Sequence, residues 1–344
     1  GFHLGLKAGC AIRDMEMVQF HPSGMLLPEK MAGTLVTEAV RGEGGKLINN
    51  RGERFMINYD SKRMELSTRD RVAIANYTEI AEGRGTPNGG VYLDISHMNK
   101  EFIMQKIPTI YRQFLDAQLL DISKEPMEVA PTAHYTMGGI VVSADEHSTS
   151  IRGLYAAGEV AGGLHGANRL GGNSLAEILV FGRKAGLASI NYSRHIQSQL
   201  KSELLIRNAH ENIDRLLHKG TEQAKALQDQ LSNIMWNHCG VIKNKQLLES
   251  GLKKVIDIKE LIEDIDVRID YQSCDDLVQV FDLEASVISA EATILSALTR
   301  QESRGSHQRS DYKELNSSEK TNYHVKLNKQ TLVLEIAKRQ IPPL

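Results

Sequence analysis

The pattern of apolar and polar positions changes near residue 195. Before it, short apolar runs alternate with glycine-rich turns, which predicts strands joined by tight connections. After it, glycines thin out and leucines recur at helical spacings up to about residue 300, which predicts a bundle of three or four helices. The fold class is therefore mixed, with an α/β part followed by an α-helical part.

Two helices and a hairpin follow from the local pattern. Residues 65–83 predict a helix that begins near Ser67 or Thr68, because these residues are good helix caps. Residues 174–195 predict a longer helix in which small residues permit close packing against a sheet. Residues 324–338 predict a β-hairpin near the end of the chain.

Strands are predicted wherever short β-rich runs meet turn residues. The first is expected to break at the turn signal His21-Pro22-Ser23-Gly24. Another pair is expected within residues 140–159, around a polar turn and directly before a glycine-rich loop. The remaining predicted strands cover residues 16–20, 35–40, 46–50 and 91–96.

Composition favours no particular class of partner. The chain has 344 residues, enough for about two domains, and its 41 Lys+Arg against 43 Asp+Glu leave a formal net charge of −2. No overall field therefore favours nucleic acid. No apolar run approaches the roughly 20 residues that a membrane helix needs. Cys10, Cys239 and Cys274 are isolated, so the sequence predicts no metal site and indicates a reducing compartment.

The glycine-rich loop at residues 158–172 is the first candidate for chemistry. We expect it to join a strand to the helix at residue 174, with Asn173 or Ser174 as the cap. A helix N-terminus carries unpaired N–H groups and a partial positive charge, so it suits an anion. A structural turn would explain the glycines alone, but Arg169 lies among them, and its planar donors suit a carboxylate.

Other segments share this glycine-flanked character. His21, His134 and His165 each lie beside glycines, and Thr37, Glu38 and Arg41 surround another glycine turn. Each histidine alone is better explained as a structural residue, but together they indicate a site for a small dianion. Arg69 lies in the first turn of a predicted helix, where the dipole disfavours a cation. An ion pair with Asp70 or Glu65 is the structural alternative for it.

Six long motifs, in this order, resemble the flavoprotein subunits of succinate dehydrogenase and fumarate reductase. The likeness is dense over residues 1–195 and thinner afterwards. L-Aspartate oxidase belongs to the same superfamily and shares some of these motifs. The motifs are MEMVQFHPSG, VTEAVRGEGGKLINNRGERFM, ELSTRDRVA, PTAHYTMGGI, GLYAAGEVAGGLHGANRLGGNSLAEILVFGRKAG and ESRGSHQRSDY.

The resemblance implies a domain arrangement. Residues 1–22 and 140–195 would form the C-terminal part of a Rossmann-like FAD-binding domain, and residues 23–139 an inserted α+β capping domain. Residues 196–305 would form a helical domain, and residues 306–344 a connector and hairpin. The first half of the family's FAD-binding domain, with its GxGxxG fingerprint, is not found here. The opening at Gly1 is typical of the middle of a helix and strand, so we expect a further N-terminal part, in this chain or in a partner.

The resemblance also implies roles for individual residues around FAD and a four-carbon dicarboxylate. Arg69 would be the proton donor or acceptor, and Glu38 and Arg41 would relay its proton. The dicarboxylate, succinate or fumarate, would be bound by His21, Thr37, His134 and Arg169. FAD would be bound by Glu159, Asn173, Ser174 and Leu175.

An iron-sulfur subunit is one implied partner, and a membrane anchor, bound through it, is another. The resemblance places such a flavoprotein in the cytoplasm, peripheral to the inner face of the cell membrane. Two alternatives stay open. One is L-aspartate oxidase, which oxidises aspartate to iminoaspartate with FAD, and the other is an inactive or assembly module.

Overall fold

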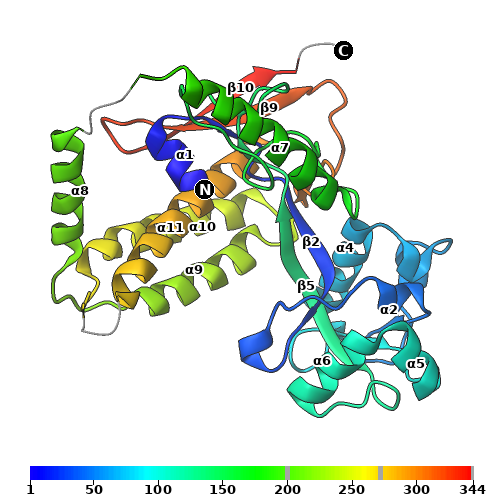
Figure 1. Ribbon diagram of the computed structural model, residues 1–344. Coiled ribbons are helices and arrows are strands. Elements are labelled where there is room, and N and C mark those ends of the chain that lie inside the picture. Colours follow the sequence, from blue (N-terminus) through cyan, green and yellow to red (C-terminus); the bar gives the residue numbers. More distant parts are fainter. Residues whose placement is uncertain (198–201, 270–273, 342–344) are drawn as a thin grey trace. The chain divides into compact units, whose positions relative to one another are not determined.

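The computed structural model describes residues 1–197, 202–269 and 274–341, and it divides into two compact units (Figure 1). Unit 2 is the continuous segment of residues 19–135, and unit 1 is made of residues 1–18 and 136–344. The chain enters unit 2 within one strand, β2 (Val18–Met25), and leaves it within another, β5 (Met127–Thr136).

Unit 2 is built on a four-stranded sheet in the order β2-β5-β4-β3. The antiparallel register sets Leu47 of β3 (Lys46–Ile48) opposite Leu93 of β4 (Val91–Asp94), so both side chains enter one core. Phe55, Phe114 and other fully buried apolar side chains fill that core, whose burial is the main force for folding. The α-helices of unit 2 are α2 (Ala39–Gly42), α3 (Met56–Tyr59), α4 (Arg69–Glu79), α5 (Lys100–Lys106) and α6 (Pro108–Gln118).

Several sequence predictions for unit 2 are confirmed and others are wrong. The predicted strands at residues 46–50 and 91–96 form β3 and β4, and the predicted helix at 65–83 contains α4. The strand predicted at residues 35–40 is wrong, because only Leu35 makes an isolated bridge and α2 follows.

The prediction that the first strand breaks at His21-Pro22-Ser23-Gly24 is wrong. The strand continues through these residues as β2. Pro22 is tolerated because β2 is the edge strand of its sheet, where a missing N–H costs no ladder bond. Strand β5 was not predicted at all, although it contains His134.

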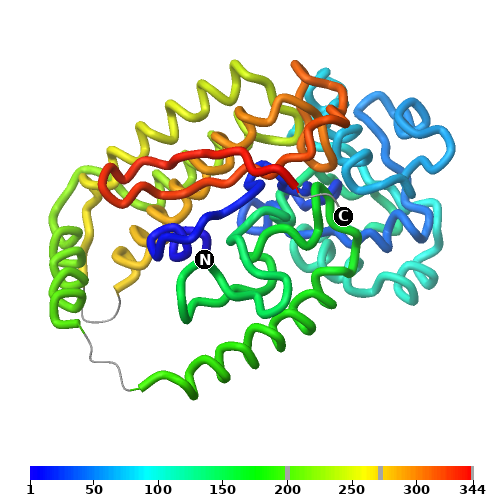
Figure 2. The backbone as a smooth tube through the Cα atoms, turned by 90° about the horizontal axis from the view of Figure 1, so that it is seen from above, coloured from blue at the N-terminus to red at the C-terminus, as the bar shows by residue number. Residues whose placement is uncertain are grey.

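Unit 1 contains a second four-stranded sheet in the order β10-β9-β1-β6. Its short strands β1 (Ile12–Arg13) and β6 (Gly139–Ile140) pair with each other, and β1 pairs on its other side with β9 (Thr321–Leu327). Strand β10 (Leu334–Gln340) completes the predicted hairpin, which is therefore confirmed. The hairpin runs beside the long helix α11 (Asp275–Thr299) (Figure 2).

The predicted helical bundle is confirmed in the described residues 202–269 and 274–299. Helices α9, α10 and α11 pack on one another around Leu227, Leu248, Val255 and Leu283, which are fully buried (Figure 1). A short parallel pair of strands, β7 (Ile242–Lys243) and β8 (Gln308–Arg309), joins this region to the segment after α11. The helices are α8 (Glu203–Leu216), α9 (Ala224–Cys239), α10 (Lys245–Leu261) and α11 (Asp275–Thr299).

Residues 140–159 depart from the two strands predicted for them. After β6, this segment makes only an isolated bridge between Ser148 and Tyr155. Ile140, the last residue of β6, makes a second isolated bridge with Ala161. Its hydrogen bonds close tight local turns instead, for example from Thr149 N–H to Leu154 O at 2.9 Å. The predicted helix after it is confirmed as α7 (Asn173–Arg194).

Arg300, at the end of α11, is the centre of a buried charged network. It is only 2% exposed and donates to the carboxylates of Glu16 at 2.5 Å, Glu302 at 3.0 Å and Asp14 at 3.2 Å. Its guanidinium also lies 4.5 Å from the ring centroid of Tyr323 in β9. The network therefore joins the first strand, the last long helix and the hairpin.

None of the helices among the described residues combines the length and the apolar character that crossing a bilayer requires. The same residues hold no cluster of three or more histidine, cysteine and acidic side chains that could bind a metal ion.

Candidate active site

Two histidines lie together on the neighbouring strands β2 and β5 of unit 2. The ring centroids of His21 and His134 are 5.4 Å apart, and the rings meet edge to face at 71°. His21 is 3% exposed, and the N–H of Ser23 donates to its Nδ1 at 3.3 Å. Both histidines lie inside strands rather than in turns, so the pairing of the strands, not the glycines, brings them together.

His21 is held neutral by its surroundings. Burial lowers its pKa to about 4, and the positive charges of Arg69, His134 and Arg41 act in the same direction. A neutral imidazole both donates and accepts hydrogen bonds. His21 therefore offers a polar contact to an anion near neutral pH rather than a full charge.

Glu38 bridges two arginines beside these histidines. Its Oε2 accepts from Nε of Arg69 at 2.8 Å and lies 2.7 Å from Nη2 of the same residue, and its Oε1 lies 4.0 Å from Nη2 of Arg41. The Thr37 hydroxyl, directly before it, accepts from the N–H of Ala39 at 3.4 Å. The predicted site residues Thr37, Glu38, Arg41 and Arg69 are thus brought together in unit 2.

Arg69 forms its ion pair with Glu38, a partner that sequence spacing does not suggest. Glu65, one of the two alternatives considered, instead forms a two-point ion pair with Arg54, and its backbone carbonyl accepts from Nη1 of Arg41. The turn that precedes α2 places Glu38 within reach of the first residue of α4. Spacing could not indicate this contact, because the two residues are 31 positions apart.

The arginine–glutamate group has unusual electrostatics. Burial acts to raise the pKa of Glu38, but hydrogen bonding to Arg69 and the charges of Arg69 and Arg41 outweigh it and lower that pKa. Burial lowers the pKa of Arg41, against the attraction of Glu38. Glu38 is thus held as an ionised carboxylate between two cations.

Arg169 lies in unit 1 on the loop before α7. It is 5% exposed, and its Nη1 donates to the carbonyl of Leu170 at 3.4 Å. Gly163, Gly166 and Gly172 around it have φ values of 111°, 57° and 84°, which side-chain-bearing residues rarely adopt. The loop therefore keeps a shape that depends on these glycines.

Helix α7 begins differently from the prediction. Gly172 is its cap residue, in the left-handed conformation, and neither Asn173 nor Ser174 caps it with a side chain. Glycine serves here because the chain must turn sharply at positive φ. The start of the helix carries exposed apolar side chains, with Leu175 at 66% and Leu179 at 73% exposure.

The residues of this region fit FAD. The first turn of α7 offers backbone N–H groups with a partial positive charge, and Leu175 beside them offers an apolar surface for a flat ring. Glu159 is exposed, and its Oε1 accepts from the N–H of Thr136 at 2.9 Å, so its carboxylate is held in one orientation. A carboxylate in such a position can accept hydrogen bonds from sugar hydroxyls.

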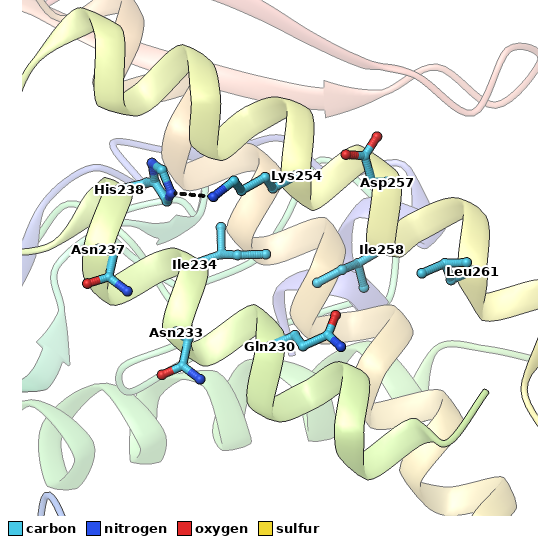
Figure 3. Close-up of a pocket in the computed structure, with 9 residues that line it drawn as sticks. All are labelled: Gln230, Asn233, Ile234, Asn237, His238, Lys254, Asp257, Ile258 and Leu261. Atoms are coloured by element: carbon cyan, nitrogen blue, oxygen red, sulfur yellow. Dashed lines mark hydrogen bonds between the residues drawn. The ribbon is translucent and has the colours of Figure 1, made fainter.

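Unit 1 contains a groove between α9 and α10. Its volume is about 400 Å³, and the Nζ of Lys254 donates to Nε2 of His238 at 3.1 Å on its rim (Figure 3). None of the residues predicted to bind substrate or FAD is among those that line it. We assign it no part in the chemistry.

One polar pair near Arg169 joins His165, which the sequence grouped with the dianion site, to Glu177, for which the sequence predicted no role. His165 Nε2 and Glu177 Oε2 are 2.8 Å apart, with side-chain exposures of 7% and 1%. The glycine-flanked position of His165 was a signal for the first partner. Nothing in the pattern marks Glu177, which lies on α7 among apolar residues.

The lowered pKa of His21 gives a prediction about stability. Because the folded pKa of about 4 is below the usual 6.5, the unfolded chain takes up the proton first as pH falls. His21 should therefore destabilise the fold progressively between pH 6.5 and 4, by at most about 3 kcal/mol. Denaturant unfolding should show a smaller loss over this range for His21→Gln than for the unsubstituted protein. An NMR titration of His21 near pH 6.5 would contradict the prediction.

Comparison with known proteins agrees with these features. A family model described as FAD binding domain matches residues 1–175, and one described as fumarate reductase flavoprotein C-term matches residues 228–341. A fumarate reductase (CoM/CoB) chain of Methanothermobacter marburgensis is 47% identical over 91% of this chain and 57% of its own length. The succinate dehydrogenase flavoprotein subunit of Rickettsia bellii is 35% identical over 93% of this chain and 55% of its own.

A solved structure of an E. coli quinol fumarate reductase mutant has a TM-score of 0.90 at 31% identity, covering 100% of this chain and 62% of that one. The chain therefore belongs to the family of flavoprotein subunits of fumarate reductase and succinate dehydrogenase, as its motifs predicted. It spans little more than half the length of the curated relatives it matches.

Proposed function

We propose that this chain carries the substrate-binding and proton-transfer residues of an FAD-dependent enzyme that interconverts succinate and fumarate. The observation that carries the proposal is the Glu38 carboxylate between Arg69 and Arg41, beside the paired rings of His21 and His134. Cationic and neutral polar groups gathered in this way suit a small dianion and one mobile proton. When bound, FAD would supply hydride chemistry at one carbon of the dicarboxylate.

The proposed roles follow from the chemistry of each group. Arg69 would hold a proton at its guanidinium and exchange it with the substrate carbon next to the hydride site. Glu38 would then restore the protonation of Arg69, with Arg41 stabilising the carboxylate between steps. Arginine is a weak acid, with a usual pKa above 12, so it needs such a partner to serve in this role. The substrate carboxylates would be bound by His21, Thr37, His134 and Arg169.

On the cofactor side, the proposed FAD contacts keep the assignment implied by the resemblance. Glu159 would bind the ribose, and the backbone of Asn173, Ser174 and Leu175 at the start of α7 would stabilise negative charge on the flavin. We retain the domain assignment with the FAD-binding, capping and helical parts. We also propose that the electron partner is an iron-sulfur subunit, that a membrane anchor is bound through it, and that the chain lies in the cytoplasm at the inner face of the membrane.

The test is an activity comparison on the full-length protein purified with its flavin. Succinate oxidation with an artificial electron acceptor, and fumarate reduction with a reduced dye, should both proceed. Hydrogen peroxide formed from aspartate, without either of these reactions, would assign L-aspartate oxidase instead. A colourless protein that FAD does not restore would favour the assembly module.

A further inference from the structure

We infer that Gly305 and Ser306 are positioning residues for Arg169. They fix the carbonyl of Ala167, two residues before the arginine, and so set the shape of the loop that carries it. These two residues belong to the ESRGSHQRSDY motif, to which the proposed chemistry gives no role. The structural part of the inference stands on contacts within unit 1, and its effect on substrate rests on the proposed function.

Ser306 makes a two-point contact with the Arg169 loop. Its backbone N–H donates to the carbonyl of Ala167 at 2.9 Å, and its hydroxyl donates to the same oxygen at 3.1 Å. The two residues are 139 positions apart, and Ser306 is 6% exposed. Two donors on one carbonyl restrict the rotation of that peptide more than a single bond would.

Gly305 is required for this close approach. A Cβ at residue 305 would lie 2.3 Å from the carbonyl oxygen of Ala167, and the residue has a φ of +56°. Real Cβ atoms do not approach a backbone oxygen so closely, so a side chain there would push the loop away. The glycine is therefore part of the contact rather than only part of its own turn.

The turn at residues 304–307, which carries Gly305 and Ser306, is held by hydrogen bonds of its own. Arg304 and His307 exchange two backbone hydrogen bonds, of 2.8 and 2.9 Å, which close the turn that presents Ser306. The carboxylate of Glu302 accepts from Arg300 at 3.0 Å and from Arg304 at 2.7 Å. The turn is thus tied to the buried network at the end of α11, and it can hold the loop in place.

A second tie fixes the same loop to α7. His165 and Glu177, 2.8 Å apart, connect the loop two residues upstream of Ala167 to the second turn of the helix. The backbone that leads to Arg169 is therefore held at two residues, His165 and Ala167. Arg169 is only 5% exposed. A shift of the loop would therefore move its guanidinium relative to the groups packed around it.

The inference can be tested without any ligand by hydrogen–deuterium exchange of the loop amides. Gly305→Ala should increase exchange in residues 163–172 by tenfold or more, and Ser306→Ala by a few-fold, because its backbone donor remains. Ser306→Thr should restore the protection of the loop. Gly52→Ala is the matched control, since Gly52 has a φ of +77° but open space around its Cβ position. Unchanged exchange in Gly305→Ala would overturn the inference.

The functional measurement uses the full-length protein with its flavin. Gly305→Ala should raise KM for the dicarboxylate, and the inhibition constant of malonate, by about tenfold, while kcat changes by less than about threefold. Equal losses of kcat and kcat/KM in Gly305→Ala would contradict a positioning role for Gly305. An equal rise of KM in Gly52→Ala would contradict it as well. If the unsubstituted protein neither binds nor converts dicarboxylates, the proposed function fails, and the exchange result still decides the role of the contact.

Discussion

Replacing Arg69 with glutamine is expected to lower turnover of succinate and fumarate by about 10² to 10⁴. Glutamine cannot hold and exchange the proton, and Glu38 would lose the cation that accounts for both its short contacts, at 2.7 and 2.8 Å. Flavin content and dicarboxylate binding should change far less than turnover, because His21, His134 and Arg169, which are among the residues proposed to bind the substrate, remain. Steady-state kinetics and flavin absorbance on one preparation measure both effects.

Arg71 provides the matched control for this substitution. It lies two residues further along α4, pairs with Asp60 at 3.5 Å and has a side chain 62% exposed. Arg71→Gln should therefore leave turnover within about twofold, since exposed ion pairs contribute little. Turnover that survives in Arg69→Gln as well would show that the proton comes from another group.

Replacing Arg300 with methionine is expected to destabilise unit 1 by about 3 to 5 kcal/mol. The guanidinium is 2% exposed and donates to three carboxylates, of which Glu16 and Glu302 are fully buried. Methionine would fill part of the volume but leave these charges without a partner. The midpoint of denaturant unfolding measures the loss.

The loss in Arg300→Met should also depend on pH. Burial raises the pKa of Glu16 to about 7, even though Arg300 opposes this, so without the arginine it would rise further. A carboxyl group with a raised folded pKa favours the fold at low pH and loses that contribution as pH rises. The penalty should thus be larger at pH 8 than at pH 5. Arg268→Met, which removes an exposed arginine that pairs with the half-buried Asp266, is the control and should change the unfolding midpoint far less.

Periodicity was sufficient to predict the longest elements of this fold. The helix at residues 174–195, the helical bundle after residue 202 and the hairpin of β9 and β10 all have strong patterns of their own. The strand that contains His134 has no such pattern, because it includes a proline and several polar residues. Its pairing with neighbouring strands overrides its weak local preference.

The same contrast between local sequence signals and long-range packing applies to the candidate site. Residue types and motifs gave His21, Glu38, Arg69 and Arg169 as candidates, but they could not say which side chains meet. The ion pair between Arg69 and Glu38 depends on the fold bringing the residue before α2 close to the first residue of α4. The contact of Ser306 with Ala167 joins segments 139 positions apart, and no local signal could indicate it. Long-range packing decides these contacts.

The pairing of β1 with β9 has a consequence for biosynthesis. Ile12 lies opposite Val325, so the sheet of unit 1 needs residues that are synthesised more than three hundred positions apart. Unit 2 is one uninterrupted stretch with its own core, and its last residue, Tyr135, leaves the ribosome long before β9 does. We therefore expect the inserted unit to fold first, while the residues before it wait for their partners.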